Sequence, residues 1–477
     1  MQRINLFLLA ATFGLASCLS PNEMPEEPQK LSYNVVIFLI DDLGWTDLGC
    51  YGSDLYETPN IDRLAEEGVK FTNAYSACTV CSPTRAAIMT GKYPARMNIT
   101  DWIAGHRNKY GKLMPPDWTK YLPNDEITLG EIAQAAGYVT ASVGKWHLGD
   151  SVVYYPQYQG FDRNVAGYYR GQPPSYFYPY VRGQDTLPYL EGGEDGEYLT
   201  DRLTDEAFRF INDHADQPFL LYFPHYAVHT PIQGKDSLTV HYQAKVTDSL
   251  QHTNAEYAAM IHSTDESVGR IMQLLDSLEI SDQTLVIFTS DNGGLELRGI
   301  TQNDPLRAGK GSAYEGGVRV PMIIRWPKAE HSSKTIDEPV ITMDVFATVA
   351  NVLGTGGAKD YHQDGVNLLS LLEQETEVLN REALYWHYPH YHPGGASPYS
   401  AIRQGNYKLI EFWEDSHLEL YNLEDDIGET NNLINEVPEV ANDLYNQLET
   451  WRKEVSAQEP LPNPQYDSLK AQEFYRF

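Results

Sequence analysis

The stretch NVVIFLI, residues 34–40, decides the fold class, because this continuous apolar run ends abruptly in Asp41 and Asp42. An unbroken apolar run of this length is typical of a strand that is buried on both faces of a parallel sheet. Four further runs of the same kind begin at Tyr138, Pro218, Thr284 and Val320. Helical patterns separate the runs, near Glu131, from about Asn254 to Leu278, and from Asp344. Strands that alternate with helices predict an α/β fold, with helices on both faces of a mostly parallel sheet.

The chain has 477 residues, of which 42% are hydrophobic and 21% charged, and this is enough to bury a large core. Beyond Gly354 the sequence changes to short segments rich in Tyr and Pro. These are followed by a hairpin pattern around residues 404–406 and an amphipathic helix over about 439–455. We therefore predict an α/β domain at residues 33–354 and a small C-terminal α+β subdomain at 355–477.

The first residues have the composition of an export signal. A basic start at Arg3 precedes an apolar run over residues 4–16, which is shorter than the roughly 20 residues that span a bilayer. The end LASC is similar to a bacterial lipoprotein signal, so we predict a signal peptide at 1–17 and a lipid anchor on Cys18. An ordinary secretory signal is the alternative. Residues 18–32 are rich in Pro and Glu and predict a flexible tether. The protein is then exported, facing the periplasm or the cell surface of a bacterium.

The formal net charge of −31 argues against a nucleic acid as partner, because binding to nucleic acid depends on basic surfaces. If the substrate is an anion, the overall field repels it. Its binding must then depend on a local cluster of cations and backbone N–H groups.

Polar residues collect where the predicted strands end. Asp41 and Asp42 follow the first strand, and Asp291 and Asn292 follow the run that begins at Thr284. In open α/β sheets ligands bind at the carboxyl ends of the strands. Carboxylate and amide oxygens suit a hard divalent cation and favour Ca²⁺ over Zn²⁺, which prefers nitrogen and sulfur.

The segment ACTVCSPTR, residues 77–85, supports two interpretations. Cys78 and Cys81 have the C-x-x-C spacing of a redox pair or of half a zinc site, while Cys81 also begins the pattern C-S-P-T-R. Ser82 as N-cap and Gly91 as stop predict a helix over 83–90, with Cys81 just outside its N-terminus. Backbone N–H groups there favour negative charge, so Cys81 is either an activated thiolate or a modified group that binds anions. Zinc would need a second ligand pair, and Cys78 is interpreted as a packed residue. Whether Cys50 and Cys78 form a disulfide stays open.

Taken in order, DD after the first strand, C-S-P-T-R, GKWHLG, HTP, SDNGG and GKG closely resemble the motifs of the type I sulfatase family. The resemblance extends from about Tyr33 to PNPQYD near the C-terminus. It implies an alkaline-phosphatase-like fold and hydrolysis of sulfuric esters. It also implies that a maturation enzyme, either a formylglycine-generating enzyme or an anaerobic counterpart, converts Cys81 to formylglycine.

By position, the resemblance assigns two sets of residues. The ligands of one Ca²⁺ would be Asp41, Asp42, Asp291, Asn292 and the modified Cys81. The other active-site residues would be Arg85, Lys145, His147, His229 and Lys310.

The chemistry of a sulfate ester fits these roles. The ester is anionic and its leaving oxygen gains charge as the S–O bond breaks, so cations and a proton donor are required. A sulfated cysteine would not easily release its sulfate to regenerate the thiol. A hydrated aldehyde has two hydroxyls: one attacks sulfur, and the second expels sulfate and restores the aldehyde. We expect Lys145 to bind the sulfate, His147 to act as general base on the second hydroxyl, and His229 to protonate the leaving sugar oxygen.

Two loops supply candidate substrate contacts, because aromatic and hydrogen-bonding side chains together suit a pyranose ring. The candidates are Trp102, His106 and Arg107 in one loop and His387, His390 and His392 in the other. These histidines could instead bind a metal or pack. Arg307 and Arg319 are expected to brace Glu315 rather than to contact substrate. The segment LYWHYPHY and its neighbours are similar to exported bacterial sulfatases that act on galactose and N-acetylgalactosamine. The leading substrate is therefore a sulfated glycan with a galacto-configured sugar, 4-O-sulfated ahead of 6-O-sulfated.

Two other functions compete with this interpretation. A phosphatase or phosphodiesterase of the same superfold would typically use Ser or Thr with zinc ligands rich in histidine, and no such set is apparent. A glycan-binding lipoprotein without activity would keep an unconverted thiol at Cys81.

Overall fold

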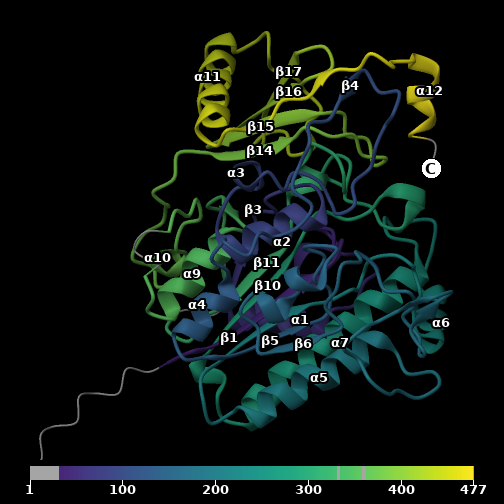
Figure 1. The fold of residues 1–477 in the computed structure, drawn as a ribbon, viewed down its shortest axis with the longest axis vertical. Coiled ribbons are helices and arrows are strands. Elements are labelled where there is room, and N and C mark those ends of the chain that lie inside the picture. The colour runs from purple at the N-terminus through teal and green to yellow at the C-terminus, as the bar shows by residue number, and fades with distance from the viewer. Residues whose placement is uncertain (1–31, 330–332, 357–360, 476–477) are drawn as a thin grey trace, which may run out of the picture. The chain divides into compact units, whose positions relative to one another are not determined.

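The strand predicted at residues 34–40 lies inside an eight-stranded sheet of the computed structural model, as β1 (Asn34–Ile40) (Figure 1). The structure describes residues 32–329, 333–356 and 361–475. The predicted signal peptide, most of the tether and the Cys18 anchor lie outside these residues and stay predictions. Every residue of β1 is buried, as expected for a strand covered on both faces.

The centre of the sheet is parallel. β1 pairs with β10 (Thr284–Ser290) on one side and with β9 (Phe219–Pro224) on the other. β5 (Val139–Val143) and β6 (Arg163–Val165) continue the parallel half beyond β9. The predicted mostly parallel sheet is confirmed.

The opposite edge of the sheet is mixed. β11 (Met322–Arg325) runs antiparallel to β10, and β2 (Val69–Phe71) runs antiparallel to β11. The outermost strand, β12 (Lys334–Ile336), is parallel to β2. The run from Val320 is therefore a strand, but it does not extend the parallel order, because the chain returns from β10 without a long crossover helix.

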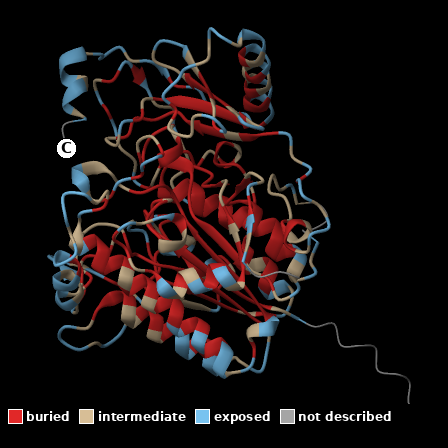
Figure 2. Cartoon of the chain, turned by 180° about the vertical axis from the view of Figure 1, so that it is seen from behind, coloured by how far each residue is buried: buried red, intermediate tan, exposed pale blue. Residues whose placement is uncertain are grey.

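Two groups of helices flank the sheet. α1 (Pro59–Glu67), α5 (Leu199–Asp213) and α7 (Ala255–Ser277) form one group, in which α7 contacts both of the others. α2 (Cys81–Thr90), α4 (Leu129–Ala135) and α9 (Asp344–Val352) form the other. Local sequence sets their starts: Thr128 and Glu131 form a capping box at α4, and Asn254 caps α7. Figure 2 shows buried residues on the inner sides of these helices. None of the helices in the described part is long and apolar enough to cross a membrane.

The C-terminal region is an antiparallel sheet with one long helix, as predicted. Its four strands are β14 (Leu384–Tyr388), β15 (Tyr399–Gln404), β16 (Tyr407–Phe412) and β17 (His417–Asn422). The predicted hairpin turn falls between Gln404 and Tyr407, and the helix is α11 (Pro438–Glu454). A second apolar cluster joins this sheet to the segment around Cys78. The described chain packs as one compact unit, and the boundary at residue 354 stays a prediction.

A buried charge cluster links the two regions. The ammonium of Lys408 in β16 lies 2.9 Å from Glu315 Oε1 and 2.9 Å from Glu429 Oε1, and all three side chains are fully buried. Glu315 begins the short helix α8 (Glu315–Val318), five residues after Lys310. The C-terminal sheet therefore braces the segment that carries Lys310.

Lys408→Ala should lower the free energy of unfolding by about 3–5 kcal/mol, because it leaves two buried carboxylates without their shared cation. Denaturant unfolding measures the loss. Arg63→Ala is the control, since its pair with Glu67 is exposed and should contribute less than about 1 kcal/mol. A Lys408→Ala protein as stable as the wild type would contradict the bracing role.

Candidate active site

The carboxyl ends of β1 and β10 bring the predicted metal ligands together. Asp41, Asp42, Asp291 and Asn292 are all buried. The Asp42 backbone N–H donates to Asp291 Oδ1 at 3.3 Å, and the Asn292 amide donates to Asp42 Oδ1 at 2.8 Å. The parallel pairing of the two strands places these side chains side by side, as the sequence predicts.

This cluster has the donor set of a cation site. Asp42 Oδ2 and Asn292 Oδ1 are buried and accept no hydrogen bond from the described residues. Ligand atoms of Asp41, Asp42, Cys81 and His229 lie within 4.8 Å of one another. Buried oxygens without a donor are costly unless a cation or another partner satisfies them. The residues therefore fit a hard divalent cation.

The two aspartates that follow β1 differ in pKa. Burial raises the pKa of Asp41 to about 8, although Lys145 acts in the opposite direction. Burial also opposes ionisation of Asp42, but Lys310, His229 and Lys145 outweigh it and hold the pKa of Asp42 below its usual range. A divalent cation beside them would favour the ionised form of both.

Cys81 is the first residue of α2, so the helix begins two residues earlier than predicted. Ser82 is not its N-cap: the hydroxyl of Ser82 donates to the backbone oxygen of His147 at 2.9 Å instead. Gly91 ends the helix in the left-handed region, with φ 70°, as predicted.

The thiol of Cys81 is buried among charged groups. Its Sγ lies 3.7 Å from Asp41 Oδ1 and 3.4 Å from the ammonium of Lys310. Burial raises the pKa of Cys81 to about 12, and the nearby lysines only partly offset this. Burial therefore disfavours the charged form of this side chain, which argues against an activated thiolate.

The C-x-x-C spacing is incidental. Cys50, Cys78 and Cys81 are free thiols in the part of the chain that the structure describes. Cys78 is buried in the apolar cluster of the C-terminal region, as its interpretation as a packed residue predicts.

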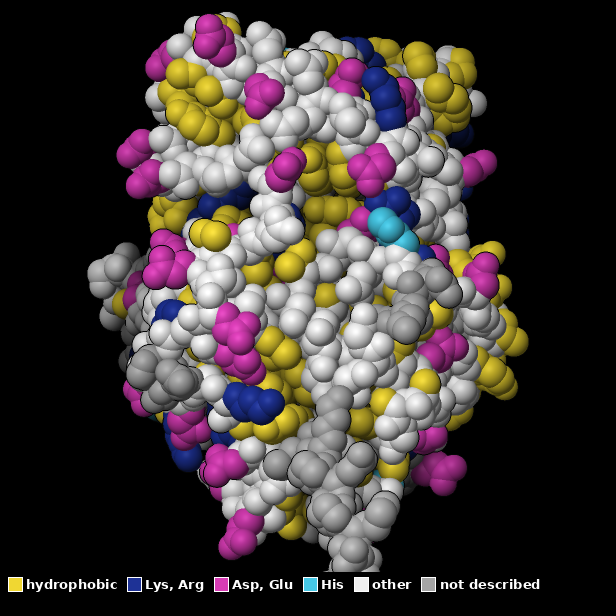
Figure 3. Space-filling model, turned by 90° about the vertical axis from the view of Figure 1, so that its left-hand side faces the viewer, with side chains coloured by type: hydrophobic (Ala, Val, Ile, Leu, Met, Phe, Trp, Pro, Cys, Tyr) yellow, Lys and Arg dark blue, Asp and Glu magenta, His cyan; other side chains and the backbone are white. Residues whose placement is uncertain are grey.

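Three buried cations face the aspartates. Lys145 Nζ lies 2.6 Å from Asp41 Oδ2, and Lys310 Nζ lies 2.6 Å from Asp42 Oδ1. Arg85 donates to Asp291 Oδ2 at 2.8 Å, and to the backbone oxygen of Lys145 at 2.8 Å. Acidic side chains are scattered over the face seen in Figure 3, whereas these cations are gathered in the interior. The local cluster required for an anionic substrate is therefore present.

The two predicted catalytic histidines, His147 and His229, both lie near Cys81, and their neutral rings have different tautomers. His147 Nε2 contacts the backbone oxygen of Ile103, which can only accept, so in the neutral ring Nδ1 carries the lone pair. His147 Nδ1 has no partner among the described residues. His229 Nδ1 donates to the backbone oxygen of Thr230 at 2.9 Å, and its Nε2 lies 3.6 Å from Asp42 Oδ2. Burial lowers the pKa of His229 to about 3, and Asp42 offsets part of this effect.

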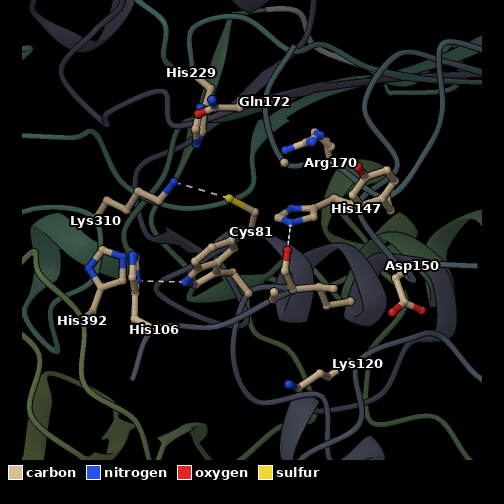
Figure 4. Close-up of a pocket in the computed structure, with 15 residues that line it drawn as sticks. Cys81, His106, Lys120, His147, Asp150, Arg170, Gln172, His229, Lys310 and His392 are labelled. Carbon is tan, nitrogen blue, oxygen red and sulfur yellow. Dashed lines mark hydrogen bonds between the residues drawn. The ribbon is translucent and has the colours of Figure 1, made fainter. Parts of the chain in front are cut away.

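A cavity of about 740 Å³ opens onto Cys81 (Figure 4). His147, His229 and Lys310 line it together with Cys81. The space exceeds what a bare sulfate needs and is in the range of sites that hold organic ligands.

The predicted substrate residues divide into two groups. Trp102, His106 and His392 line the cavity, whereas Arg107, His387 and His390 are absent from its lining. Arg107 is exposed. His387 is buried and bonds Ser400 Oγ at 2.8 Å, and His390 is buried and bonds Thr100 Oγ1 at 2.8 Å. The structure thus gives these two histidines packing partners instead of a place in the cavity.

Sequence reasoning missed several lining residues: Lys120, Asp150, Tyr169, Arg170 and Gln172. They come from loops without a recognisable pattern, so only the packed structure brings them to the site. Gln172 lies beside His229 in Figure 4, and its amide oxygen accepts a bond from the Thr230 hydroxyl at 3.3 Å.

The two arginines near Glu315 have different partners. Arg319 Nη1 lies 3.3 Å from Glu315 Oε2, so the bracing interpretation is right for Arg319. Arg307 instead stacks on the ring of Tyr314 and donates to the backbone oxygen of Glu429 at 2.8 Å.

The chain has a mixed, mostly parallel sheet flanked by helices, acidic residues at the strand ends, and an antiparallel C-terminal sheet. This is the fold of the alkaline-phosphatase-like class of hydrolases. The model of the Sulfatase family matches residues 33–355. The model described as N-sulphoglucosamine sulphohydrolase, C-terminal, matches residues 309–454. The chain belongs to the sulfatase family and is a sulfuric ester hydrolase.

Individual relatives agree with this assignment. A sulfatase of Formosa agariphila is 33% identical, with 98% of each chain covered. The N-acetylgalactosamine-6-sulfatase of Homo sapiens is 34% identical over 74% of this chain and 68% of its own. The structure of Ps i-CgsB in complex with k-i-k-neocarrahexaose is 28% identical, covers 93% of this chain and 97% of its own, and has a TM-score of 0.76.

Proposed function

We propose that this sulfatase hydrolyses the sulfate ester of a galactose or N-acetylgalactosamine residue in a sulfated glycan, using formylglycine made from Cys81 and one Ca²⁺. The observation that carries the proposal is the position of Cys81. Cys81 begins a helix, lines the cavity of about 740 Å³, and lies between Lys310 and the buried aspartates.

The oxygen donors of Asp41, Asp42, Asp291 and Asn292 would hold the Ca²⁺. The ion would supply Lewis-acid stabilisation of charge on sulfate oxygens, and hydrated formylglycine would supply the nucleophilic hydroxyl. The oxygens of Asp42 and Asn292 that accept no hydrogen bond within the described part of the chain support this assignment.

Charge balance explains how an acidic protein can bind an anion here. Three buried aspartates face three buried cations, so the formal charges of these side chains cancel. A bound divalent cation then makes the cluster net positive. The ammonium groups of Lys145 and Lys310 can donate hydrogen bonds to sulfate oxygens, and this stabilises the charge that develops in the transition state.

The histidines fit opposite proton-transfer roles. The free Nδ1 lone pair of His147, fixed by the bond from Nε2 to Ile103, suits a general base near Cys81. His229 lines the cavity, where it would protonate the leaving sugar oxygen. The negative charge of a bound sulfate ester raises the pKa of His229 relative to the empty cavity, which is the direction that a proton donor requires.

The glycan part of the proposal has separate support. Aromatic and hydrogen-bonding side chains of Trp102, His106, His392 and Gln172 line the cavity. Relatives named N-acetylgalactosamine-6-sulfatase favour a galacto-configured sugar and a 6-O ester. The resemblance carried by the LYWHYPHY segment puts the 4-O ester first, so both positions belong in the test.

Sulfate release from a panel of sugars tests the proposal. The panel holds galactose and N-acetylgalactosamine with a single 4-O- or 6-O-sulfate, matched glucose esters, and the corresponding sugar phosphates. We expect release from one galacto-configured ester, near-complete loss after EGTA treatment, and recovery with Ca²⁺. The protein must come from a host that forms formylglycine. Release of phosphate without sulfate, or full activity in EGTA, would contradict the proposal.

A further inference from the structure

The cavity wall beside Lys310 carries two histidines from distant parts of the chain. His106 lies in the loop after α3 (Pro94–Met97), and His392 lies four residues after the end of β14. Their rings pack edge to face with centroids 5.2 Å apart, and both line the cavity (Figure 4). Neither ring takes part in the chemistry at Cys81 described above.

The hydrogen on His106 has a defined position. Trp102 Nε1 lies 2.9 Å from His106 Nδ1. An indole N–H can only donate, so Nδ1 must accept and must carry the lone pair. The hydrogen of the neutral imidazole is therefore on Nε2.

The same argument applies to His392. The backbone N–H of Gly394 donates to His392 Nδ1 at 2.9 Å, so this ring also carries its hydrogen on Nε2. The turn is held in place: Ala396 donates to the backbone oxygen of Gly311 at 2.8 Å, and His392 N–H donates to the backbone oxygen of Ala396 at 2.9 Å. A Cβ on Gly311 would lie 1.7 Å from His392 Nδ1, so only glycine permits this approach.

Both rings are uncharged. Burial, helped by the charge of Lys310, lowers the pKa of His106 to about 4 and the pKa of His392 well below its usual value. Two neutral N–H donors therefore stand beside a cationic cluster. Neutral donors match neutral acceptors such as sugar hydroxyl and ring oxygens, whereas the sulfate is matched by Lys145 and Lys310.

We propose that His106 and His392 form a fixed pair of neutral N–H donors that binds oxygens of the sulfated sugar ring and so determines which sugar is accepted. The inference rests on the proposed function, because it takes a sugar ester as the substrate. Trp102 is a positioning residue in this arrangement, since its N–H holds the tautomer of His106.

Kinetics on two substrates test the pair. We compare the sugar ester that the wild type hydrolyses best with 4-nitrophenyl sulfate, which lacks sugar hydroxyls. His106→Ala and His392→Ala should each lower kcat/KM for the sugar ester about ten-fold. Hydrolysis of the aryl ester and inhibition by inorganic sulfate should change less than about two-fold, because neither involves the lost donors.

Matched variants separate lost hydrogen bonds from lost packing. His106→Gln and His392→Gln keep an N–H donor close to the position of Nε2 and should recover most of the activity on the sugar ester. Trp102→Phe keeps an aromatic ring but removes the N–H, so the ¹⁵N NMR signals of His106 should show a mixture of tautomers in this variant and the Nε2–H form alone in the wild type.

Several results would overturn the pairing. The histidines would not recognise the sugar if their alanine variants lost kcat/KM equally on the sugar and aryl esters. An unchanged kcat/KM for the sugar ester, or weaker inhibition by inorganic sulfate, would lead to the same conclusion. A wild type that hydrolyses the aryl ester but no sugar ester would refute the proposed function itself, and the inference with it.

Discussion

Cys81→Ala should abolish sulfate release from every ester and leave the fold intact. The expected loss is four or more orders of magnitude, roughly the effect of removing a nucleophile from other hydrolases. The substitution removes only the Sγ atom of this buried side chain, so the free energy of unfolding should change by about 1 kcal/mol or less. Sulfate release and denaturant unfolding on the same samples measure both effects.

Cys78→Ala is the matched control for this experiment. Cys78 is also a buried thiol, three residues earlier, but it packs in the C-terminal cluster and is absent from the cavity lining. Its variant should keep activity within about two-fold. Comparable losses in both variants would show that Cys81 acts through packing, and the assignment of Cys81 would then be wrong.

His229→Ala should lower kcat on the sugar ester by about 10²–10⁴-fold, the usual range for a lost general acid. A sugar alkoxide is a poor leaving group and needs the proton. A nitrophenolate leaves without one, so 4-nitrophenyl sulfate should lose far less activity. The ratio of the two losses is the measurement that identifies a proton donor.

His225→Gln is the control for His229. His225 lies in the same HYAVHTP segment and is buried, but it bonds Ser267 Oγ at 2.9 Å and does not line the cavity. This variant should retain activity on both substrates. Near-normal hydrolysis of the sugar ester by His229→Ala would remove its role as the acid.

The parts of the fold that the sequence predicted have strong local signals. Buried parallel strands appear as unbroken apolar runs, so NVVIFLI and the runs at Thr284 and Pro218 identified the centre of the sheet. Polar residues at the carboxyl ends of neighbouring parallel strands share one edge of a sheet. The pairing of β1 with β10 therefore brings Asp41, Asp42, Asp291 and Asn292 together, as their positions after two apolar runs predict.

Features that depend on tertiary contacts were less predictable. The hydroxyl of Ser82 bonds the backbone of His147 instead of capping α2, so the helix begins at Cys81. The loop residues Arg170 and Gln172 reach the cavity only through packing. His387 and His390 share a motif with His392, yet only His392 faces the cavity, because side chains of a strand and its turn point in different directions.

The proposed reaction depends on the chemical state of Cys81, and one tryptic peptide reports that state. Residues 71–85, FTNAYSACTVCSPTR, contain both Cys78 and Cys81. In protein from the native host, alkylation before digestion and mass spectrometry should find a label on Cys78 and an aldehyde at Cys81. A peptide from the same protein with labelled thiols at both positions would contradict the conversion of Cys81 to formylglycine.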